Sequence, residues 1–509
     1  MEIQTMIGQR LAFGFRETTL TQDFIDMVRE YKIGNVILFY WNIINADQLR
    51  QLCRDIQGLI QEETGHPAFI TIDQEGGMVH RLSPDLVNVP GNMAAVAAGT
   101  PETAYCLAQI TARQLRGTGV NLNLAPVLDV NNNPANPVIG TRSYGDDPQR
   151  VAEFGAAAVR GYAESGLMCC GKHFPGHGDT AVDSHLGLPL IDKSLAELRK
   201  NELIPFQAAI DAGIPAIMSS HILFPQIEPK RIPATMSRRI MHDLLRDEMG
   251  FQGLILSDTM EMDAIRKHYG TPLGMIGAMN AGIDLVFVSR FTDVQHECLP
   301  VIRRAVENGD ISLDNLTESY ERILAFKKKY AFTQAEPDLA SHPEDFAAAR
   351  ETACDAVVLY SGKHYPLKKN TFFCGPKDYR MTDADNEADK HLDFVGQMAK
   401  KIGIQGCECS VDPTAEEIEM ITAEAGKHDN IVLGTCNAHL FCGQLALAAS
   451  LAKTGKPLTV IALRDPYDLS ELPDCTAKAA VFDYTIDGLY AAEQFLLTGN
   501  APGCMPVRI

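Results

Sequence analysis

Residues 167–179, LMCCGKHFPGHGD, join an apolar run to a segment dense in titratable side chains. The run 167–170 is typical of a buried strand, and Pro175, Gly176 and Gly178 disfavour both helix and strand beyond it. The sequence therefore predicts a strand followed by a loop that begins at Lys172. Titratable groups just past the end of a buried strand are typical of the active sites of α/β enzymes.

Seven more apolar runs of this kind occur in the first 330 or so residues. They are residues 11–13, 36–39, 68–72, 122–125, 216–218, 254–256 and 285–288. Helical patterns lie between them, at residues 22–30, 46–61, 102–115, 151–163, 195–210 and 238–249. Repeated strand–helix units predict a parallel sheet, and eight strands over this length suit a closed (β/α)8 TIM-type barrel, with an open doubly wound sheet as the alternative.

The length of 509 residues suits two domains. We expect a catalytic barrel over residues 1–332, closed by a helix at 311–329, and then a polar, proline-containing linker over 333–350. Residues 351–509 repeat the alternation on a smaller scale, which predicts an αβα-sandwich domain built on an open parallel sheet. Its apolar runs are residues 356–360, 371–374, 431–433, 458–463 and 479–482.

Composition and charge narrow the class of protein. The formal net charge of −20 argues against nucleic acid or an anionic membrane as a partner. We find neither a signal-peptide pattern nor the run of about 18–20 apolar residues that a membrane span needs. The 13 cysteines, several in apolar runs, suit reduced thiols in a cytoplasmic protein, and their spacing does not suit a structural zinc. A homo-oligomer is left open.

Polar side chains follow strand after strand in the first domain. They are Asp73, Asp129, Lys172 with His173, Ser219-Ser220-His221, and Asp258. In a barrel these positions gather at one end. Carboxylates and cations placed together can hold neighbouring hydroxyl groups through charge-assisted hydrogen bonds. The pattern therefore predicts a site for a small carbohydrate.

Three blocks of sequence carry a family resemblance. They are DQEGG at 73–77, KHFPGHGD at 172–179 with DSH at 183–185, and SDTMEM at 257–262. Together they resemble glycoside hydrolase family 3, and most closely its β-N-acetylglucosaminidase (β-hexosaminidase) branch in the two-domain form. Residues 123–129, 136–144, 219–221 and 233–237 support the resemblance. It implies a hydrolase with a TIM barrel, active in cytoplasmic peptidoglycan recycling, with no cofactor and no metal.

The resemblance also implies a retaining mechanism with a covalent glycosyl-enzyme. Asp258 stands where the family has its nucleophile, and a carboxylate suits that task because it is ionised at neutral pH. By itself, an aspartate after a strand is often only a helix N-cap. Asp263 is a rival in position, although it lies further into the next helical pattern.

For the acid/base group, the resemblance implies a histidine on a loop, His185, oriented by Asp183. An imidazole has an ordinary pKa of about 6.5, so it can both donate and accept a proton near neutral pH. Metal binding by His173, His177 and His185 is the alternative, but nothing in the spacing defines a ligand geometry.

The substrate-binding residues implied by the resemblance are Asp73, Arg142, Lys172 and His173. Arg142 is otherwise read as an exposed loop cation. His177 and Asp179 are read as residues that only maintain the shape of the loop.

One position departs from the family pattern. An arginine usually follows Gly76-Gly77 and reaches the sugar, whereas this chain has Met78. A thioether cannot donate a hydrogen bond, so we expect the hydroxyls of the sugar to be bound differently here. Arg81 matches a second family arginine that we do not expect to make the same contact.

The leading hypothesis is a β-N-acetylhexosaminidase that releases N-acetylglucosamine from muropeptide or chitin-type fragments. A phosphorylase is the chemical alternative, because an imidazole acid/base does not repel inorganic phosphate as a carboxylate would. A non-catalytic sugar-binding protein is the alternative from another class. In the second domain, the loop 436–440 either reaches an active site or only packs.

Overall fold

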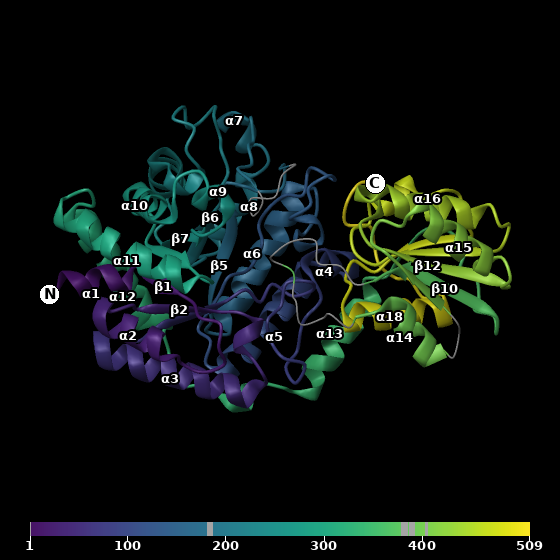
Figure 1. Cartoon of the computed structure of the whole chain (residues 1–509), viewed down its shortest axis with the longest axis horizontal. Helices are drawn as coiled ribbons and strands as arrows, with labels where there is room; N and C mark the ends of the chain where they lie inside the picture. Colours follow the sequence, from purple (N-terminus) through teal and green to yellow (C-terminus); the bar gives the residue numbers. More distant parts are fainter. Residues whose placement is uncertain (1, 181–186, 378–384, 386–391, 403–405) are drawn as a thin grey trace.

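The computed structural model describes residues 2–180, 187–377, 385, 392–402 and 406–509. It has two parts side by side, a large barrel and a smaller sandwich (Figure 1). The N-terminus lies on the side of the barrel that faces away from the sandwich. Both parts alternate strands with helices, so the chain is a mixed α/β protein, as the sequence predicts.

Eight parallel strands form a closed barrel in chain order, with β1 paired to β8. They are β1 (Leu11–Phe13), β2 (Asn35–Leu38), β3 (Phe69–Ile72), β4 (Leu122–Asn123), β5 (Met168–Phe174), β6 (Ala216–Ser219), β7 (Leu254–Thr259) and β8 (Leu285–Val288). Each of the eight predicted strands overlaps one of them. The closed barrel is confirmed, and the alternative of an open sheet is wrong for this domain.

Strand β5 is longer than the sequence predicts, and Lys172 and His173 belong to the strand rather than to the loop. The segment after β4 extends the pairing, because Leu128 N–H donates to the Lys172 carbonyl at 2.7 Å. On the other side, Ser220 N–H donates to the Phe174 carbonyl at 2.9 Å. These bonds extend the strand to the residue before Pro175, so Lys172 and His173 have rigid backbone positions.

Helices surround the barrel strands. They are α1 (Ile3–Gln9), α2 (Gln22–Tyr31), α3 (Ala46–Thr64), α4 (Asn92–Ala98), α5 (Pro101–Thr118), α6 (Pro148–Glu164), α7 (Leu195–Leu198), α8 (Leu203–Asp211), η4 (Arg239–Glu248), α9 (Asp263–Arg266), α10 (Thr271–Ala281), α11 (Thr292–Glu307) and α12 (Leu313–Tyr330). Local signals set their ends: the Asn45 side chain accepts from Gln48 N–H at the start of α3, and Gly65 ends it with a left-handed backbone. The single helix predicted over 195–210 is wrong, because it is divided into α7 and α8.

The second sheet has six strands in the order β11-β10-β12-β13-β14-β9. They are β9 (Val358–Gly362), β10 (Thr371–Pro376), β11 (Gly406–Cys409), β12 (Asn430–Thr435), β13 (Leu458–Ala462) and β14 (Ala477–Ala480). The prediction of an open parallel sheet is correct for five of these strands. It is wrong for β9, which pairs antiparallel with β14. Strand β11 was not predicted, because only its last residue is fully buried and it has no apolar run.

Helices cover both faces of this sheet, because alternate residues of its strands enter two separate apolar clusters. Phe372 of β10 belongs to the cluster on one face and Phe373 to that on the other. One face is covered by α15 (Ala415–Ala425) and α16 (Cys442–Ala452), and the other by α13 (Pro343–Asp355), α14 (Phe394–Ile402) and α18 (Ile486–Thr498). Both faces are dry, which explains why the central strands are continuous apolar runs.

The two parts share an apolar contact. Met93, Ala94 and Ala97 of α4, a barrel helix, are buried in a cluster otherwise made by the sandwich. Between the parts, the chain passes from α12 through the short turn η5 (Pro337–Leu339) into α13. None of the described helices is long and apolar enough to cross a membrane.

Candidate active site

The largest group of predicted site residues lies around one pocket in the barrel. The pocket has an empty volume of ≈ 670 Å³ and is open to solvent. Its polar lining residues are Asp73, Glu75, Arg81, Arg142, Lys172, His173, His177, Asp258, Thr259 and Arg290. They follow or end strands of the barrel, so the pocket is at the carboxyl end, where parallel α/β barrels have their active sites.

Glu75 is at the centre of a buried network of charges. Its carboxylate accepts two hydrogen bonds from Arg142, from Nε and Nη2, both at 2.8 Å. Lys172 Nζ lies 2.6 Å from Glu75 and 2.7 Å from Asp73. The side chains of Glu75 and Lys172 are only 3% and 2% exposed, whereas Asp73 is 19% exposed. Asp73 is thus the carboxylate of this network that is most open to a ligand.

The pKa values of Glu75 and Lys172 are both shifted in the direction that favours the charged form. Burial alone would raise the pKa of Glu75, but the charges of Arg142 and Lys172 outweigh it and hold that pKa well below its ordinary value. Burial would lower the pKa of Lys172, but Asp73 and Glu75 raise it above its ordinary value. Lys172 therefore presents a permanent ammonium group to the pocket, and it cannot act as a base at neutral pH.

His173 is held by a second buried carboxylate, Asp129, which follows β4. Asp129 Oδ2 lies 2.7 Å from His173 Nδ1, and Asp129 Oδ1 accepts from the His177 backbone N–H at 2.7 Å. The hydrogen bond at Nδ1 leaves Nε2 as the His173 atom that can meet a ligand. Burial would raise the pKa of Asp129, but the contact with His173 holds it below its ordinary value.

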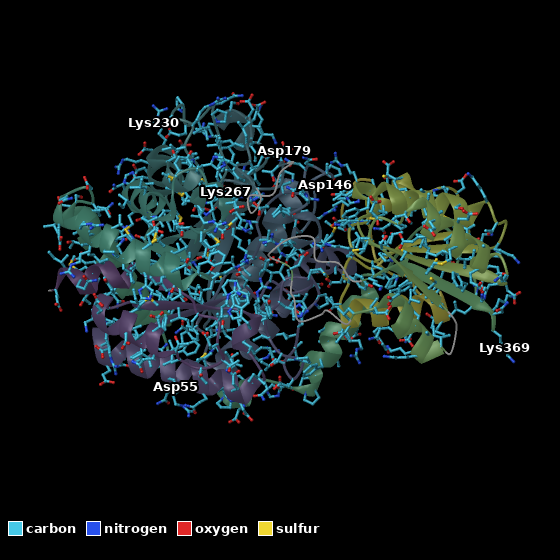
Figure 2. The ribbon with its side chains drawn as sticks, in the orientation of Figure 1. Asp55, Asp146, Asp179, Lys230, Lys267 and Lys369 are labelled. Atoms are coloured by element: carbon cyan, nitrogen blue, oxygen red, sulfur yellow. The ribbon has the colours of Figure 1, made fainter. Side chains whose placement is uncertain are left out.

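His177 stands edge-on to His173, with 5.6 Å between the ring centroids. Burial, and after it the proximity of His173, lower the pKa of His177 to about 4, so this ring is neutral near pH 7. Its Nδ1 lies 3.0 Å from the Thr180 hydroxyl. Asp179 meets Lys193 at 2.6 Å; Figure 2 labels Asp179 at the surface of the barrel. These contacts anchor both ends of the segment 176–180.

Asp258 is located near the end of β7 and lines the pocket. One of its oxygens, Oδ1, accepts from the Thr259 backbone N–H at 2.7 Å. The rival carboxylate Asp263 is not part of the pocket lining, and it pairs with Arg266 at 2.8 Å and Lys267 at 2.6 Å. The structure therefore separates the two candidates: Asp258 is at the cavity and Asp263 is in a local salt bridge on α9.

The structure brings five of the seven predicted site residues to this pocket: Asp73, Arg142, Lys172, His173 and Asp258. Arg142 is 7% exposed, so its reading as an exposed loop cation is wrong. The other two, Asp183 and His185, lie outside the described residues.

Sequence reasoning missed Glu75 and Arg290 as site residues. Glu75 was quoted in the block at 73–77, and its spacing of two from Asp73 was the available signal. Arg290 is two residues beyond β8, so the rule applied at the ends of the other strands would have found it. Its guanidinium carbon lies 5.6 Å from the centroid of Phe39, another lining residue.

Met78 does not occupy the position that the sequence analysis gave it. It is buried in an apolar cluster with Phe373, Phe394 and Tyr484 of the sandwich, and it is not part of the pocket lining. Arg81 lines the pocket instead, with its guanidinium carbon 5.8 Å from the Phe39 ring centroid. The expectation that Met78 removes a sugar contact is therefore wrong, because the residue after Gly77 faces the second domain.

Within the described residues, one set of three side chains brings potential metal-ligand atoms within 4.8 Å of one another. It consists of His242, Asp243 and Asp247 on η4, outside the pocket lining, with both aspartates exposed. His173 and His177 are not members of such a set in this part of the chain. The pocket itself offers ion pairs and hydrogen-bonding groups for a polyhydroxylated ligand.

Comparison with known proteins agrees with this geometry. The family model described as the glycosyl hydrolase family 3 N terminal domain matches residues 3–326. The chain belongs to glycosyl hydrolase family 3. Members of this family are glycoside hydrolases, and the matched residues include every described residue of the pocket lining.

The relatives share a common name. A protein named beta-hexosaminidase A from Pseudoalteromonas piscicida is 33% identical over 375 residues, 66% of this chain and 62% of the relative. A beta-hexosaminidase from Stenotrophomonas maltophilia is 37% identical over 55% of this chain and 82% of its own length. The chain thus spans less than two thirds of the first relative and most of the second.

A solved structure resembles the chain over both parts. It is the family 3 beta-N-acetylglucosaminidase from Paenibacillus sp. str. FPU-7, which is 35% identical with a TM-score of 0.93. The similarity covers 100% of this chain and 99% of that chain. The barrel and the sandwich therefore form a combination that occurs as a unit in another family member.

Proposed function

We propose that this protein is a retaining β-N-acetylhexosaminidase that releases terminal β-linked N-acetylglucosamine from muropeptide or chitin-type oligosaccharides. The observation that carries the proposal is that Asp258 lines the same pocket as the charged network of Asp73, Lys172 and Arg142. The names of the relatives and of the similar solved structure support the same activity. We place this activity in cytoplasmic peptidoglycan recycling: the 13 cysteines, several of them in apolar runs, suit a reducing compartment, and the family resemblance implies the pathway.

In this proposal, four side chains hold the terminal sugar. Asp73 accepts hydrogen bonds from hydroxyl groups, while Lys172 and Arg142 donate to the hydroxyl oxygens. His173 forms a hydrogen bond to the sugar through its Nε2 atom. Because Glu75 and Asp129 already hold Arg142, Lys172 and His173 in place, little side-chain freedom is lost when the sugar binds.

The reaction has two steps. The Asp258 carboxylate attacks the anomeric carbon and forms an ester, while the bond to the departing oxygen breaks and that oxygen takes a proton from His185. A water molecule then loses a proton to His185 and bonds to the anomeric carbon, and Asp258 leaves. Two inversions retain the β configuration. Asp183 orients the His185 imidazole and stabilises its protonated form.

Covalent trapping tests the nucleophile. A fluorinated slow substrate derived from N-acetylglucosamine should accumulate as an ester that peptide mass spectrometry finds on Asp258. A label on any other side chain would contradict the mechanism. The same assay on Asp258→Ala provides the control, because that variant should remain unlabelled.

Phosphate in the assay separates hydrolysis from phosphorolysis. Four cationic side chains line the pocket (Arg81, Arg142, Lys172 and Arg290), which makes an anionic co-substrate a meaningful alternative. We expect free N-acetylglucosamine as the product with or without phosphate. Formation of the sugar 1-phosphate would replace the hydrolase by a phosphorylase.

The leaving group tests the proposed acid. His185→Ala should lower kcat/KM by about 10²–10⁴-fold for a natural disaccharide, because its departing oxygen needs a proton. The loss should be much smaller for a nitrophenyl glycoside, since nitrophenolate leaves without protonation. Equal losses on the two substrates would count against His185. Asp183→Asn should show the same contrast at smaller size.

A further inference from the structure

Two carboxylates of the sandwich hold the backbone of the barrel beside the pocket. Asp465, just beyond β13, accepts a hydrogen bond from the Thr141 N–H at 3.0 Å. Asp483, just beyond β14, accepts from the Gly91 N–H at 2.8 Å. Asp465 and Asp483 are only 3% and 2% exposed, so both bonds lie deep between the two parts of the molecule.

The Asp465 contact acts on the residue next to Arg142. Thr141 and Arg142 belong to the short turn η2 (Gly140–Arg142). A side chain on Gly140 would have its Cβ only 2.5 Å from Asp465 Oδ1, so the sandwich carboxylate touches this turn directly. The position of η2 determines the position of the Arg142 Cα atom, and thus where its side chain enters the network.

The Asp483 contact reaches the same arginine by a second route. Next to Gly91, the Asn92 side chain donates to the Arg142 carbonyl at 2.7 Å. Asp483 also touches Gly77, where an added Cβ would lie 2.5 Å from Asp483 Oδ1. Gly77 is two residues beyond Glu75, so Asp483 contacts both the segment that carries the carboxylate partner of Arg142 and the segment that holds its backbone.

More bonds join the sandwich to the segment that precedes Arg142. Tyr467 OH accepts from the Asn131 side chain at 2.9 Å, and His439 Nε2 lies 3.1 Å from the Pro134 carbonyl. His439 is itself held by Asp468, 2.8 Å from its Nδ1. The loop 436–440 therefore packs on the barrel, and no described residue of the sandwich lines the pocket.

The last residues of the sandwich domain also form hydrogen bonds with the barrel. Arg508 N–H donates to Asp146 Oδ2 at 3.1 Å, and Figure 2 shows Asp146 on the side of the barrel that faces the sandwich. Arg150 Nη1 donates to the Pro506 carbonyl at 2.7 Å. The whole stretch from residue 131 to 150 is thus bonded to the second domain at several points.

We infer that the sandwich is a positioning domain for the sugar-binding network, and that Asp465 and Asp483 are positioning residues that act through Arg142 and Glu75. This inference rests on the proposed function of the pocket. The two domain carboxylates set the backbone at both ends of the Glu75–Arg142 ion pair. Glu75 of that ion pair also binds Lys172. A displacement of the backbone at either end would therefore shift three charged side chains of the network: Glu75, Arg142 and Lys172.

Alanine and asparagine variants test the inference in the full-length chain. Asp465→Ala and Asp483→Ala remove the acceptor and should each raise KM for nitrophenyl N-acetyl-β-glucosaminide about tenfold. Asp465→Asn and Asp483→Asn keep a carbonyl oxygen in the same place and should restore most of the loss. The effect should fall mainly on KM, because Asp258 is not displaced.

A matched control comes from the sandwich itself. Asp412 Oδ1 accepts from the Gly443 N–H at 2.7 Å, which is the same kind of contact, but it lies wholly within the sandwich. Asp412→Ala should lower the melting temperature and leave KM unchanged. If Asp465→Ala and Asp483→Ala also leave KM unchanged, the sandwich is only a packing domain and the inference is wrong.

Coupling to Arg142 separates positioning from general loosening. In an Arg142→Gln background, Asp465→Ala should raise KM little further, because the group it acts through is already gone. Full additivity of the two effects would overturn the proposed route. If an alanine variant does not fold, Tyr467→Phe removes only one hydroxyl contact and should raise KM two- to threefold; an unchanged KM there would count against the inference. Wild-type turnover is measured in the same series, so a failure of the proposed function is seen separately.

Discussion

The two ends of the barrel both bury charged side chains, yet they differ in what surrounds those charges. At the carboxyl end, Glu75, Arg142 and Lys172 pair with one another beside an open pocket. At the amino end, Asp284 accepts from Arg322 at 2.6 Å and from Arg246 at 3.1 Å.

Other charges at the amino end bind mostly backbone. Arg10 donates to the Ile283 carbonyl at 2.5 Å, and Lys327 donates to the Gly34 carbonyl at 2.8 Å. Burial lowers the pKa of Lys327 well below its ordinary value. In the described part of the chain, Asp284, Arg10 and Lys327 do not line the pocket at the carboxyl end or four further pockets of the molecule.

The comparison shows that a buried charge, even one with a strongly shifted pKa, does not mark a functional site by itself. At the amino end of the barrel, the charged side chains form ion pairs with one another and hydrogen bonds to backbone carbonyl groups. At the carboxyl end, the same kinds of side chain leave one side facing a cavity. An empty volume beside the charges is what distinguishes the two ends.

The largest expected effect at the carboxyl end is that of Asp258→Ala. Loss of the nucleophile should lower kcat on the order of 10⁴-fold or more, with an unchanged melting temperature. Turnover of a chromogenic N-acetyl-β-glucosaminide measures the loss. Asp263→Ala is the matched control, five residues further on and engaged only in a local salt bridge, and it should retain activity.

At the amino end, Asp284→Asn should affect stability and not catalysis. The substitution leaves Arg246 and Arg322 without their buried counter-charge, which should lower the free energy of unfolding by about 3–5 kcal/mol. Denaturant unfolding measures that change. A KM for the glycoside that differs from wild type would contradict the contrast between the two ends.

Glu75→Gln should reverse that pattern. A neutral amide cannot balance both Arg142 and Lys172, so kcat/KM should fall by about 10–100-fold. Steady-state kinetics give the loss and its division between KM and kcat. The control is Asp345→Asn, because Asp345 also meets an arginine, Arg113, through both oxygens, but outside the pocket lining. Equal kinetic losses in the two variants would point to general destabilisation.

The smallest expected change in kinetics is that of an Arg81 variant, which we compare with a variant of Met78. Arg81→Met removes a cation that lines the pocket and should raise KM by about tenfold. Met78→Leu conserves volume in the cluster against the sandwich and should leave KM unchanged while costing less than about 1.5 kcal/mol of stability. The opposite result would restore the position after Gly77 as the sugar-contacting one.

Much of the architecture could be read from local patterns. The apolar runs and helical periodicities identified all eight barrel strands, because a strand buried on both faces must be a continuous apolar run. The extension of β5 through Lys172 and His173 could not be read in this way. It depends on hydrogen bonds from Leu128 and Ser220, which lie 44 and more residues away from their partners in the chain.

The candidate site shows the same division. Asp73, Lys172, His173 and Asp258 were named from sequence because they follow predicted strands, whereas Arg142 was named only because the family resemblance implies it. Glu75 was not, since its role depends on two partners far away in the chain, Arg142 in the turn η2 and Lys172 on β5. The sequence analysis placed position 78 at the sugar and did not expect Arg81 to take its place, whereas Arg81 lines the pocket and Met78 does not. Sequence spacing in an irregular loop does not tell which side chain points into the pocket.

By itself, the sequence determined the barrel, the presence of a second α/β part, the family, and the residue types at the carboxyl ends of the strands. These follow from side-chain periodicity and motif spacing, which are local properties of the chain. Only the tertiary structure decided which of those charged side chains share a pocket and which residue after Gly77 faces that pocket. It also decided where the second domain forms hydrogen bonds with the first. These depend on contacts between residues tens to hundreds of positions apart, and no local pattern records them.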